Sequence, residues 1–176
     1  MRSRRAAVAV VVLLAAGLSG CNKIKARQEI KKGNEFFKAT QYQAALANYV
    51  EAQRLDPGEK RLDKFIGETY MALYQPGSKH PKDLEFAGNA IKRLQSYLVA
   101  YPNDKKVREY LVSMYLALDR YDDAIGFYQD LIKSSPSDVK AMTSLAAMYF
   151  KKGDFQNGLE WEKKRAALEP KNSEPY

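Results

Sequence analysis

Apolar residues follow two patterns along the chain. The first is an unbroken apolar run of 13 residues, Ala6–Leu18, with arginines before it and polar residues after it. The second begins near residue 26 and consists of segments in which aromatic and small residues recur at fixed distances before a proline. No segment alternates apolar and polar residues as a half-buried strand does. The two patterns predict an export signal followed by an all-helical domain.

The second pattern repeats with a fixed period. Three segments that end in proline align without gaps: residues 40–57, 119–136 and 153–170. An aromatic residue lies fifteen positions before each proline, and a small residue lies twelve positions before it. Pro102, Pro136 and Pro170 are 34 residues apart, whereas Pro57 lies 45 residues before Pro102. The period predicts stacked structural repeats, and the longer interval indicates an 11-residue insertion in one of them.

A 34-residue period with this pattern resembles the tetratricopeptide repeat. In the first unit, Gly33, Phe36, Ala45 and Tyr49 match the small and aromatic packing positions of that family. The resemblance implies an all-α fold, a right-handed helical solenoid of about four helix–turn–helix units. One helical hairpin cannot bury its apolar face alone, so several must stack.

The expected organisation follows from the period. Its parts are a signal peptide (1–20), a lipidated tether (21–25), a solenoid (26–172) with units 26–59, 60–104, 105–138 and 139–172, and the start of a truncated fifth unit (173–176). A naturally short protein with a frayed tail is the alternative for the last residues. The insertion, near residues 75–85, forms either a loop or extra helical turns. Pro81 suits the start of a helix, and His80 is expected to be an exposed loop residue.

The start of the chain has the plan of a secretory signal, in which basic residues precede an apolar run and small residues. Leu18-Ser19-Gly20-Cys21 resembles the lipobox of bacterial lipoproteins, which implies cleavage before Cys21 and acylation of that cysteine. A transmembrane helix needs about 17–25 residues, and the run from Ala6 through Cys21 has only 16. The other alternative is an ordinary cleavage site near an unmodified Cys21. Asn22, rather than aspartate, after the cysteine favours the outer membrane.

Net charge and the small number of cysteines and histidines exclude several classes of function. The 176-residue chain carries a net charge of +8, and cleavage removes three of its 29 basic residues and no acidic residue, which leaves +5. This moderate charge on an exported protein gives little reason to expect nucleic-acid binding. One cysteine and one histidine exclude a disulfide scaffold and the usual zinc sites. Residues 22–32 carry five basic residues against Glu29, which suits either contact with anionic lipid headgroups or a simple tether.

Solenoid repeats usually present their first helices on the concave side, and residues seven and eleven apart share one helix face. These positions predict a partner-binding groove with a basic edge and an apolar floor. Its residues are Arg27, Asn34, Phe37, Lys38, Arg61, Glu68, Met71, Lys106, Ser113, Leu116, Lys140, Phe150 and Lys151. Such a groove would favour partner segments with carboxylates or a free C-terminus. Alternatively, the basic row is solvated and the apolar row is core.

The leading functional hypothesis is a non-enzymatic scaffold that is lipid-anchored in the bacterial cell envelope and binds a protein or peptide. The alternative is an accessory or N-terminal part of a longer envelope protein or enzyme, for example an outer-membrane or pilus assembly factor. No cofactor, metal or catalytic residue is expected, because the chain has one histidine and no glycine-rich phosphate loop. A third functional hypothesis is that a tyrosine-rich surface binds glycans.

Overall fold

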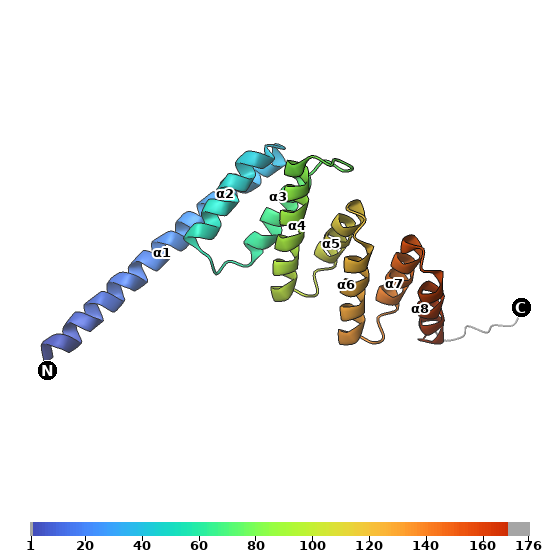
Figure 1. The fold of residues 1–176 in the computed structure, drawn as a ribbon. Helices are drawn as coiled ribbons and strands as arrows, with labels where there is room; N and C mark the ends of the chain where they lie inside the picture. Colours follow the sequence, from blue (N-terminus) through green and yellow to red (C-terminus); the bar gives the residue numbers. More distant parts are fainter. Residues whose placement is uncertain (1, 169–176) are drawn as a thin grey trace, which may run out of the picture. The chain divides into compact units, whose positions relative to one another are not determined.

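The computed structural model describes the backbone of residues 2–168 and the side chains of residues 20–168. Pro170 and the expected fifth unit lie outside the described residues. Across 2–168 the elements are all helices, joined by turns and loops, with no strand, so the predicted all-α fold is confirmed (Figure 1). The helices are α1 (Arg2–Lys38), α2 (Tyr42–Leu55), α3 (Arg61–Leu73), α4 (Pro81–Ala100), α5 (Lys105–Ala117), α6 (Tyr121–Ser134), α7 (Val139–Lys152) and α8 (Phe155–Leu168).

The chain divides into two compact units, residues 1–111 and 112–176, with the boundary inside α5. In the first unit, α2 packs on both α1 and α3, and α3 packs on α4. In the second unit, α7 packs on both α6 and α8. Successive helices thus pair as helical hairpins within each unit, as the repeat pattern predicts.

Each unit has its own set of buried apolar residues. In the first unit the core cluster consists of Ala26, Ala45, Tyr49, Ala52, Leu62 and Ile66. In the second unit the buried apolar residues include Ala124, Ile125, Ile132, Met142, Leu145, Ala146 and Met148. Small and large residues alternate in both sets, which lets neighbouring helices approach closely while the larger side chains fill the space beside the contact.

Three of the hairpin turns, those before α2, α6 and α8, share a backbone conformation. The residue two positions before α2, α6 or α8 has a positive φ in each case: 58° at Thr40, 54° at Asp119 and 86° at Gly153. This left-handed conformation ends one helix and reverses the chain for the next. Glycine adopts it without strain, and a short polar side chain such as that of Asp119 tolerates it better than a bulky one.

The insertion expected in the second repeat, residues 60–104, is shared between a loop and a longer helix. α4 has 20 residues, whereas α2, α6 and α8 have 14 each, and residues 74–80 form the loop before it. Pro81 occupies the first turn of α4, as expected from the sequence. His80 is exposed and caps this helix, since its Nδ1 accepts a hydrogen bond from the backbone N–H of Lys82 at 3.2 Å.

A buried carboxylate links three helices of the first unit. Asp63 on α3 is only 5% exposed. Its oxygens accept hydrogen bonds from Arg93 Nη1 at 2.9 Å and Ser96 Oγ at 2.7 Å, both on α4. Gln53 Nε2 on α2 lies 3.4 Å from Oδ1, a weaker contact. A buried charge is tolerated only when it is paired and hydrogen-bonded, and Asp63 meets both conditions.

α1 and α2 pack closely at Gly33. A Cβ atom at this position would lie 2.5 Å from Cε1 and 2.7 Å from Cδ1 of Tyr49, too close for any real contact. The Tyr49 ring cannot easily move, because it is 2% exposed and stacks on Phe65 with 5.5 Å between ring centroids. The glycine is therefore required by packing, as the family pattern implies.

We expect Gly33→Ala to lower the free energy of unfolding by about 1–3 kcal/mol, the usual cost of overpacking a core. Gly88→Ala on α4 is the matched control, since a Cβ there meets nothing within 4 Å. That substitution should stabilise the protein by up to about 1 kcal/mol through helix propensity. Urea unfolding followed by circular dichroism measures both. A parallel shift of the two midpoints would contradict the packing argument.

Candidate functional site

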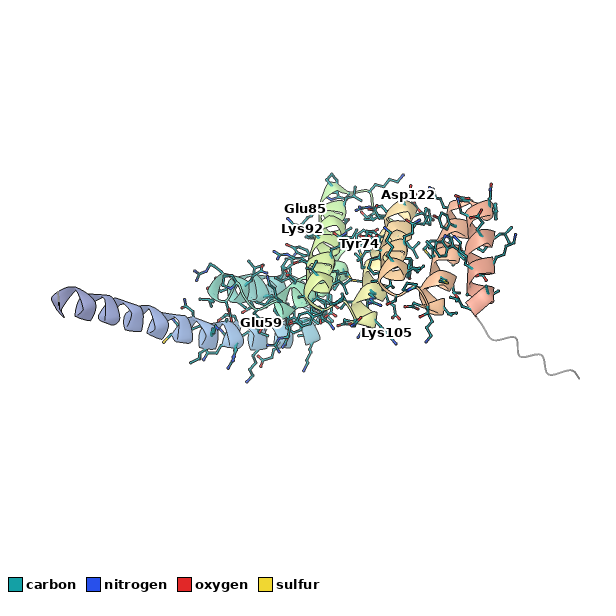
Figure 2. The ribbon with its side chains drawn as sticks, turned by 90° about the horizontal axis from the view of Figure 1, so that it is seen from below. Glu59, Tyr74, Glu85, Lys92, Lys105 and Asp122 are labelled. Carbon is teal, nitrogen blue, oxygen red and sulfur yellow. The ribbon has the colours of Figure 1, made fainter. Side chains whose placement is uncertain are left out.

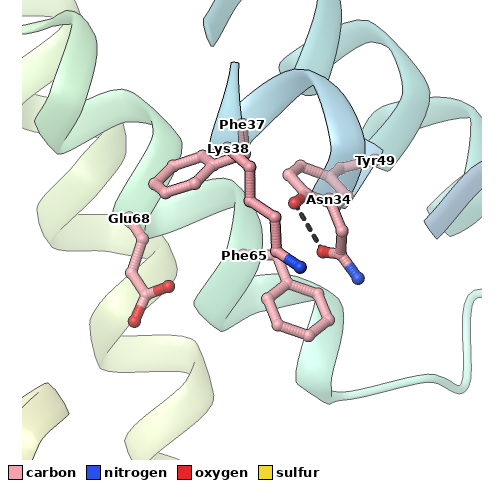
Figure 3. A pocket seen from close by; sticks show the side chains of 6 residues that line it. All are labelled: Asn34, Phe37, Lys38, Tyr49, Phe65 and Glu68. Atoms are coloured by element: carbon pink, nitrogen blue, oxygen red, sulfur yellow. Dashed lines mark hydrogen bonds between the residues drawn. The ribbon is translucent and has the colours of Figure 1, made fainter. Parts of the chain in front are cut away.

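The first unit contains a pocket of about 180 Å³ formed by three successive helices (Figure 3). Its lining residues are Asn34, Phe37 and Lys38 from α1, Tyr49 from α2, and Phe65 and Glu68 from α3. Four of the six, Asn34, Phe37, Lys38 and Glu68, are residues that helix-face spacing places in the predicted groove. The pocket therefore brings these four side chains together. Tyr49 and Phe65 are lining residues that the sequence reasoning missed.

Aromatic rings form the apolar part of the pocket. Tyr49 and Phe65 are stacked, with an interplanar angle of 24°. Phe37 is half-buried and meets Tyr42 edge to face at a centroid distance of 5.3 Å. Because these rings are held by their own neighbours, they offer a preformed apolar surface to a partner side chain.

The Tyr49 hydroxyl donates a hydrogen bond to Asn34 Oδ1 at 2.7 Å, which fixes the orientation of the amide. Figure 3 shows the amide nitrogen of Asn34 directed away from this bond. Burial, together with the nearby negative charge of Glu68, raises the pKa of Tyr49 to about 12. Tyr49 therefore stays a neutral donor at physiological pH, and the Asn34 amide N–H groups remain available to a carbonyl oxygen.

Two opposite charges lie at the pocket. Lys38 is exposed, and Glu68 is half-buried; neither forms an ion pair within residues 20–168. Burial raises the pKa of Glu68 above its ordinary value, while the positive charges of Lys64 and Lys106 act in the opposite direction. Lys64 itself is committed to Asp104, with Nζ 2.9 Å from Oδ2. Lys38 and Glu68 are thus free to pair with charges on a bound partner.

The other predicted groove residues of the first unit lie outside this pocket. Arg61 forms a bidentate ion pair with Glu59, at 2.6 and 2.8 Å. The Lys106 ammonium lies 5.5 Å from the centroid of the Tyr110 ring. Met71 is half-buried, and Arg27 lines a second pocket, of about 320 Å³. Of the predicted basic groove residues in this unit, only Lys38 lines the aromatic pocket.

The remaining predicted residues belong to the second unit. Ser113, Lys140 and Lys151 are exposed and Leu116 is half-buried. Phe150 packs against Gly158 of α8, and its ring centroid lies 6.3 Å from that of Phe155. This aromatic contact lies within the hairpin of α7 and α8.

The described residues contain neither a metal-binding cluster nor a helix able to span a membrane. Within them, no group of three or more His, Cys, Asp or Glu side chains could hold a metal ion. None of their helices is long and apolar enough to cross a membrane. The pocket of about 180 Å³ combines rings, an amide and two charges, a set suited to holding a peptide segment.

A family model described as "Tetratricopeptide repeat" matches residues 83–139 and 115–172, together just over half of the chain. A curated relative, the U-box domain-containing protein 70 of Oryza sativa subsp. japonica, is 26% identical over 114 residues. That match covers 65% of this chain and 13% of the relative, so the chain spans only a small part of the relative's length.

Solved structures of MamA have a similar fold. One MamA crystal structure has a TM-score of 0.58 at 17% identity, covering 81% of this chain and 77% of that one. A MamA double mutant has a TM-score of 0.56 at 17% identity, covering 85% and 78%. MamA from Desulfovibrio magneticus has a TM-score of 0.55 at 18% identity, covering 84% and 77%. At these identities the likeness concerns the fold.

Proposed function

The chain belongs to the tetratricopeptide repeat family, and we propose that it is a non-catalytic protein-binding scaffold. Its first unit holds an extended partner segment in the aromatic pocket. The residues of that pocket are Asn34, Phe37, Lys38, Tyr49, Phe65 and Glu68. The family match and the fold support the general role of binding proteins. The observation that carries the specific proposal is the convergence of unpaired charges and rigid rings at one pocket.

The pocket's chemistry suggests how such a segment binds. An apolar side chain of the partner lies against Phe37 and Phe65, where burial of apolar surface stabilises the complex. The Asn34 amide donates to a backbone carbonyl of the partner, because its oxygen is already engaged by Tyr49. Lys38 pairs with a carboxylate of the partner, and Glu68 pairs with a basic group. The sequence predicted a partner segment with carboxylates, and Glu68 means that this segment should also contain a basic side chain.

The test is a peptide display selection on the purified full chain, followed by fluorescence anisotropy with the selected peptides. Lys38→Glu and Glu68→Lys should each weaken binding about tenfold or more, because each turns an attraction of roughly 1.4 kcal/mol into a repulsion. Lys163→Glu, an exposed charge reversal on α8, is the control.

Peptides that bind all three variants with the affinity of the original protein would refute the pocket as the binding site. Lys38 and Glu68 take no part in the apolar core cluster, so their variants should remain folded, although Glu68→Lys also loses the attraction of Lys64 and Lys106. Denaturant unfolding of each variant checks that the fold is kept. A change in affinity can then be assigned to the site.

We also propose that the scaffold is a lipoprotein of the bacterial cell envelope, held at the periplasmic face of the outer membrane by lipid on Cys21. The lipobox-like sequence Leu18-Ser19-Gly20-Cys21 and the basic-then-apolar leader support this proposal. Cys21 is exposed, as acylation requires. An acylated cysteine would keep the pocket at a membrane surface, where envelope proteins are its available partners.

A further inference from the structure

The first part of α1 after Cys21 carries several basic side chains without partners. Lys23, Lys25, Arg27 and Lys31 are all exposed, and none forms an ion pair within residues 20–168. The acidic residue of this stretch, Glu29, is paired with Lys32 at 2.7 Å. This stretch of α1 therefore presents an unneutralised positive charge.

Two other segments bring further groups to the same place. The second pocket, of about 320 Å³, joins Lys23 and Arg27 on α1 with Lys60, in the turn before α3, and Tyr101, just after α4. Lys60 forms no ion pair among the described residues, and Tyr101 is 39% exposed. We call Lys23, Arg27, Lys60 and Tyr101 the basal surface.

Acidic residues beside the basal surface offset only part of its charge, because three basic side chains face one aspartate and one glutamate that is already paired. Glu59 and Asp56 also line the pocket. Hydrogen bonding to the Arg61 guanidinium lowers the pKa of Glu59, with a smaller contribution from the charge of Arg27. Glu59 is thus already neutralised by Arg61, at 2.6 Å. Figure 2 labels Glu59, which lines the same pocket as the basal surface, and Lys92 on α4, which does not.

The basal surface lies close to Cys21 along a rigid element. Residues 21–25 are helical and continuous with the rest of α1, and Ala26 is already buried at 2% exposure. At 1.5 Å per residue, Lys23 lies about 3 Å and Arg27 about 9 Å beyond Cys21 along the axis. These distances are within one Debye length, about 10 Å at 0.1 M salt.

We propose that the basal surface docks onto anionic phospholipid headgroups of the leaflet that holds the Cys21 lipid, and so fixes the first repeat against the membrane. The inference rests on the lipid anchor proposed above. Charge complementarity carries it: basic side chains near an anionic bilayer are each attracted to it, and a tyrosine ring suits the interface. Ile24, 59% exposed between two lysines, adds apolar surface that a headgroup layer can cover.

The test is lysine footprinting of the processed full-length protein in phosphatidylcholine vesicles with or without phosphatidylglycerol. Lys60 is the key reporter, because it is far from Cys21 in sequence. Its reaction with an amine-reactive label should slow about fivefold when phosphatidylglycerol is present, as one contact with an anionic surface allows. Protection should fade at high salt. Lys92 and Lys163, exposed elsewhere, should react equally in both vesicles.

Matched variants sharpen the result. Lys23→Gln with Arg27→Gln should abolish the protection of Lys60, whereas Lys92→Gln with Lys163→Gln, the same loss of charge elsewhere, should leave it intact. Equal labelling of Lys60 in both vesicles would overturn the proposal. The mass of the Cys21 peptide from the same samples tests the anchor separately: an unmodified thiol would refute the anchor, while the Lys60 protection would still decide the basal surface.

Discussion

Replacing Asp63 by alanine is expected to lower the free energy of unfolding by about 2–4 kcal/mol, because it removes the buried carboxylate that holds the Arg93 guanidinium. The substitution also removes the acceptor for Ser96. Losing both bonds weakens the attachment of α3 to α4, which then depends on apolar packing. Denaturant unfolding of the purified chain measures the loss.

Asp130→Ala is the matched control for this prediction. Asp130 also pairs with a basic residue, Lys133 at 2.8 Å, but its side chain is 75% exposed. Exposed pairs of this kind contribute only about 0–1 kcal/mol. A combined Asp63→Leu and Arg93→Met variant should be less destabilised than Asp63→Ala, since it removes both charges together. Equal midpoints for Asp63→Ala and Asp130→Ala would show that the buried pair does not stabilise the first unit.

Replacing Cys21 by serine should abolish the incorporation of an alkyne-tagged fatty acid into the protein in growing bacteria. The effect is all or none, because Cys21 is the only cysteine in the chain. In-gel fluorescence after coupling of a dye to the alkyne reads the result. The physical reason is that only a thiol at this position can receive the first lipid chain expected from the lipobox-like sequence.

A second variant controls for nonspecific thiol labelling. Combining Cys21→Ser with Ser135→Cys moves the thiol to an exposed position after α6. Labelling should not return, because the leader sequence no longer precedes the cysteine. Label on that variant, or none on the original protein, would remove the proposed anchor.

Much of the fold could be predicted because the repeat acts through short-range rules. The small residue Gly33 and the aromatic Tyr49 pack against each other, as their positions in the repeat imply. Pro81 begins α4, since proline fits the first turn of a helix and breaks later ones. These features depend on local backbone chemistry and on one period, both of which the sequence contains.

The pairing of Asp63 with Arg93 could not be predicted in the same way. The two residues are 30 positions apart and are separated by the insertion, so their register depends on how much of that segment becomes helix. The sequence is compatible with either a loop or extra helical turns in the insertion, and the structure contains both. A single aspartate in a helix that also carries solvated charges gives no local sign that it will be buried.

The pocket was predictable only in part. Helix-face spacing brings Asn34 and Lys38 together because both lie on one helix. It misses Tyr49, which reaches the pocket from the second helix of the hairpin. It also places Arg61 in the groove, although the guanidinium turns back to Glu59 two residues earlier. Helical period shows which residues share a face, but it does not show which of their side chains are already paired with a residue nearby in sequence.

The unbroken helix from Gly20 to Lys38 has a mechanical consequence. Cys21 and Asn34 are 13 residues apart on it, so about 20 Å of stiff rod separates the attachment point from the pocket. In a protein anchored through Cys21, this rigid helix fixes the distance between the lipid and the pocket. The helix would hold a bound partner at a defined distance from the bilayer, whereas a flexible linker would allow that distance to vary.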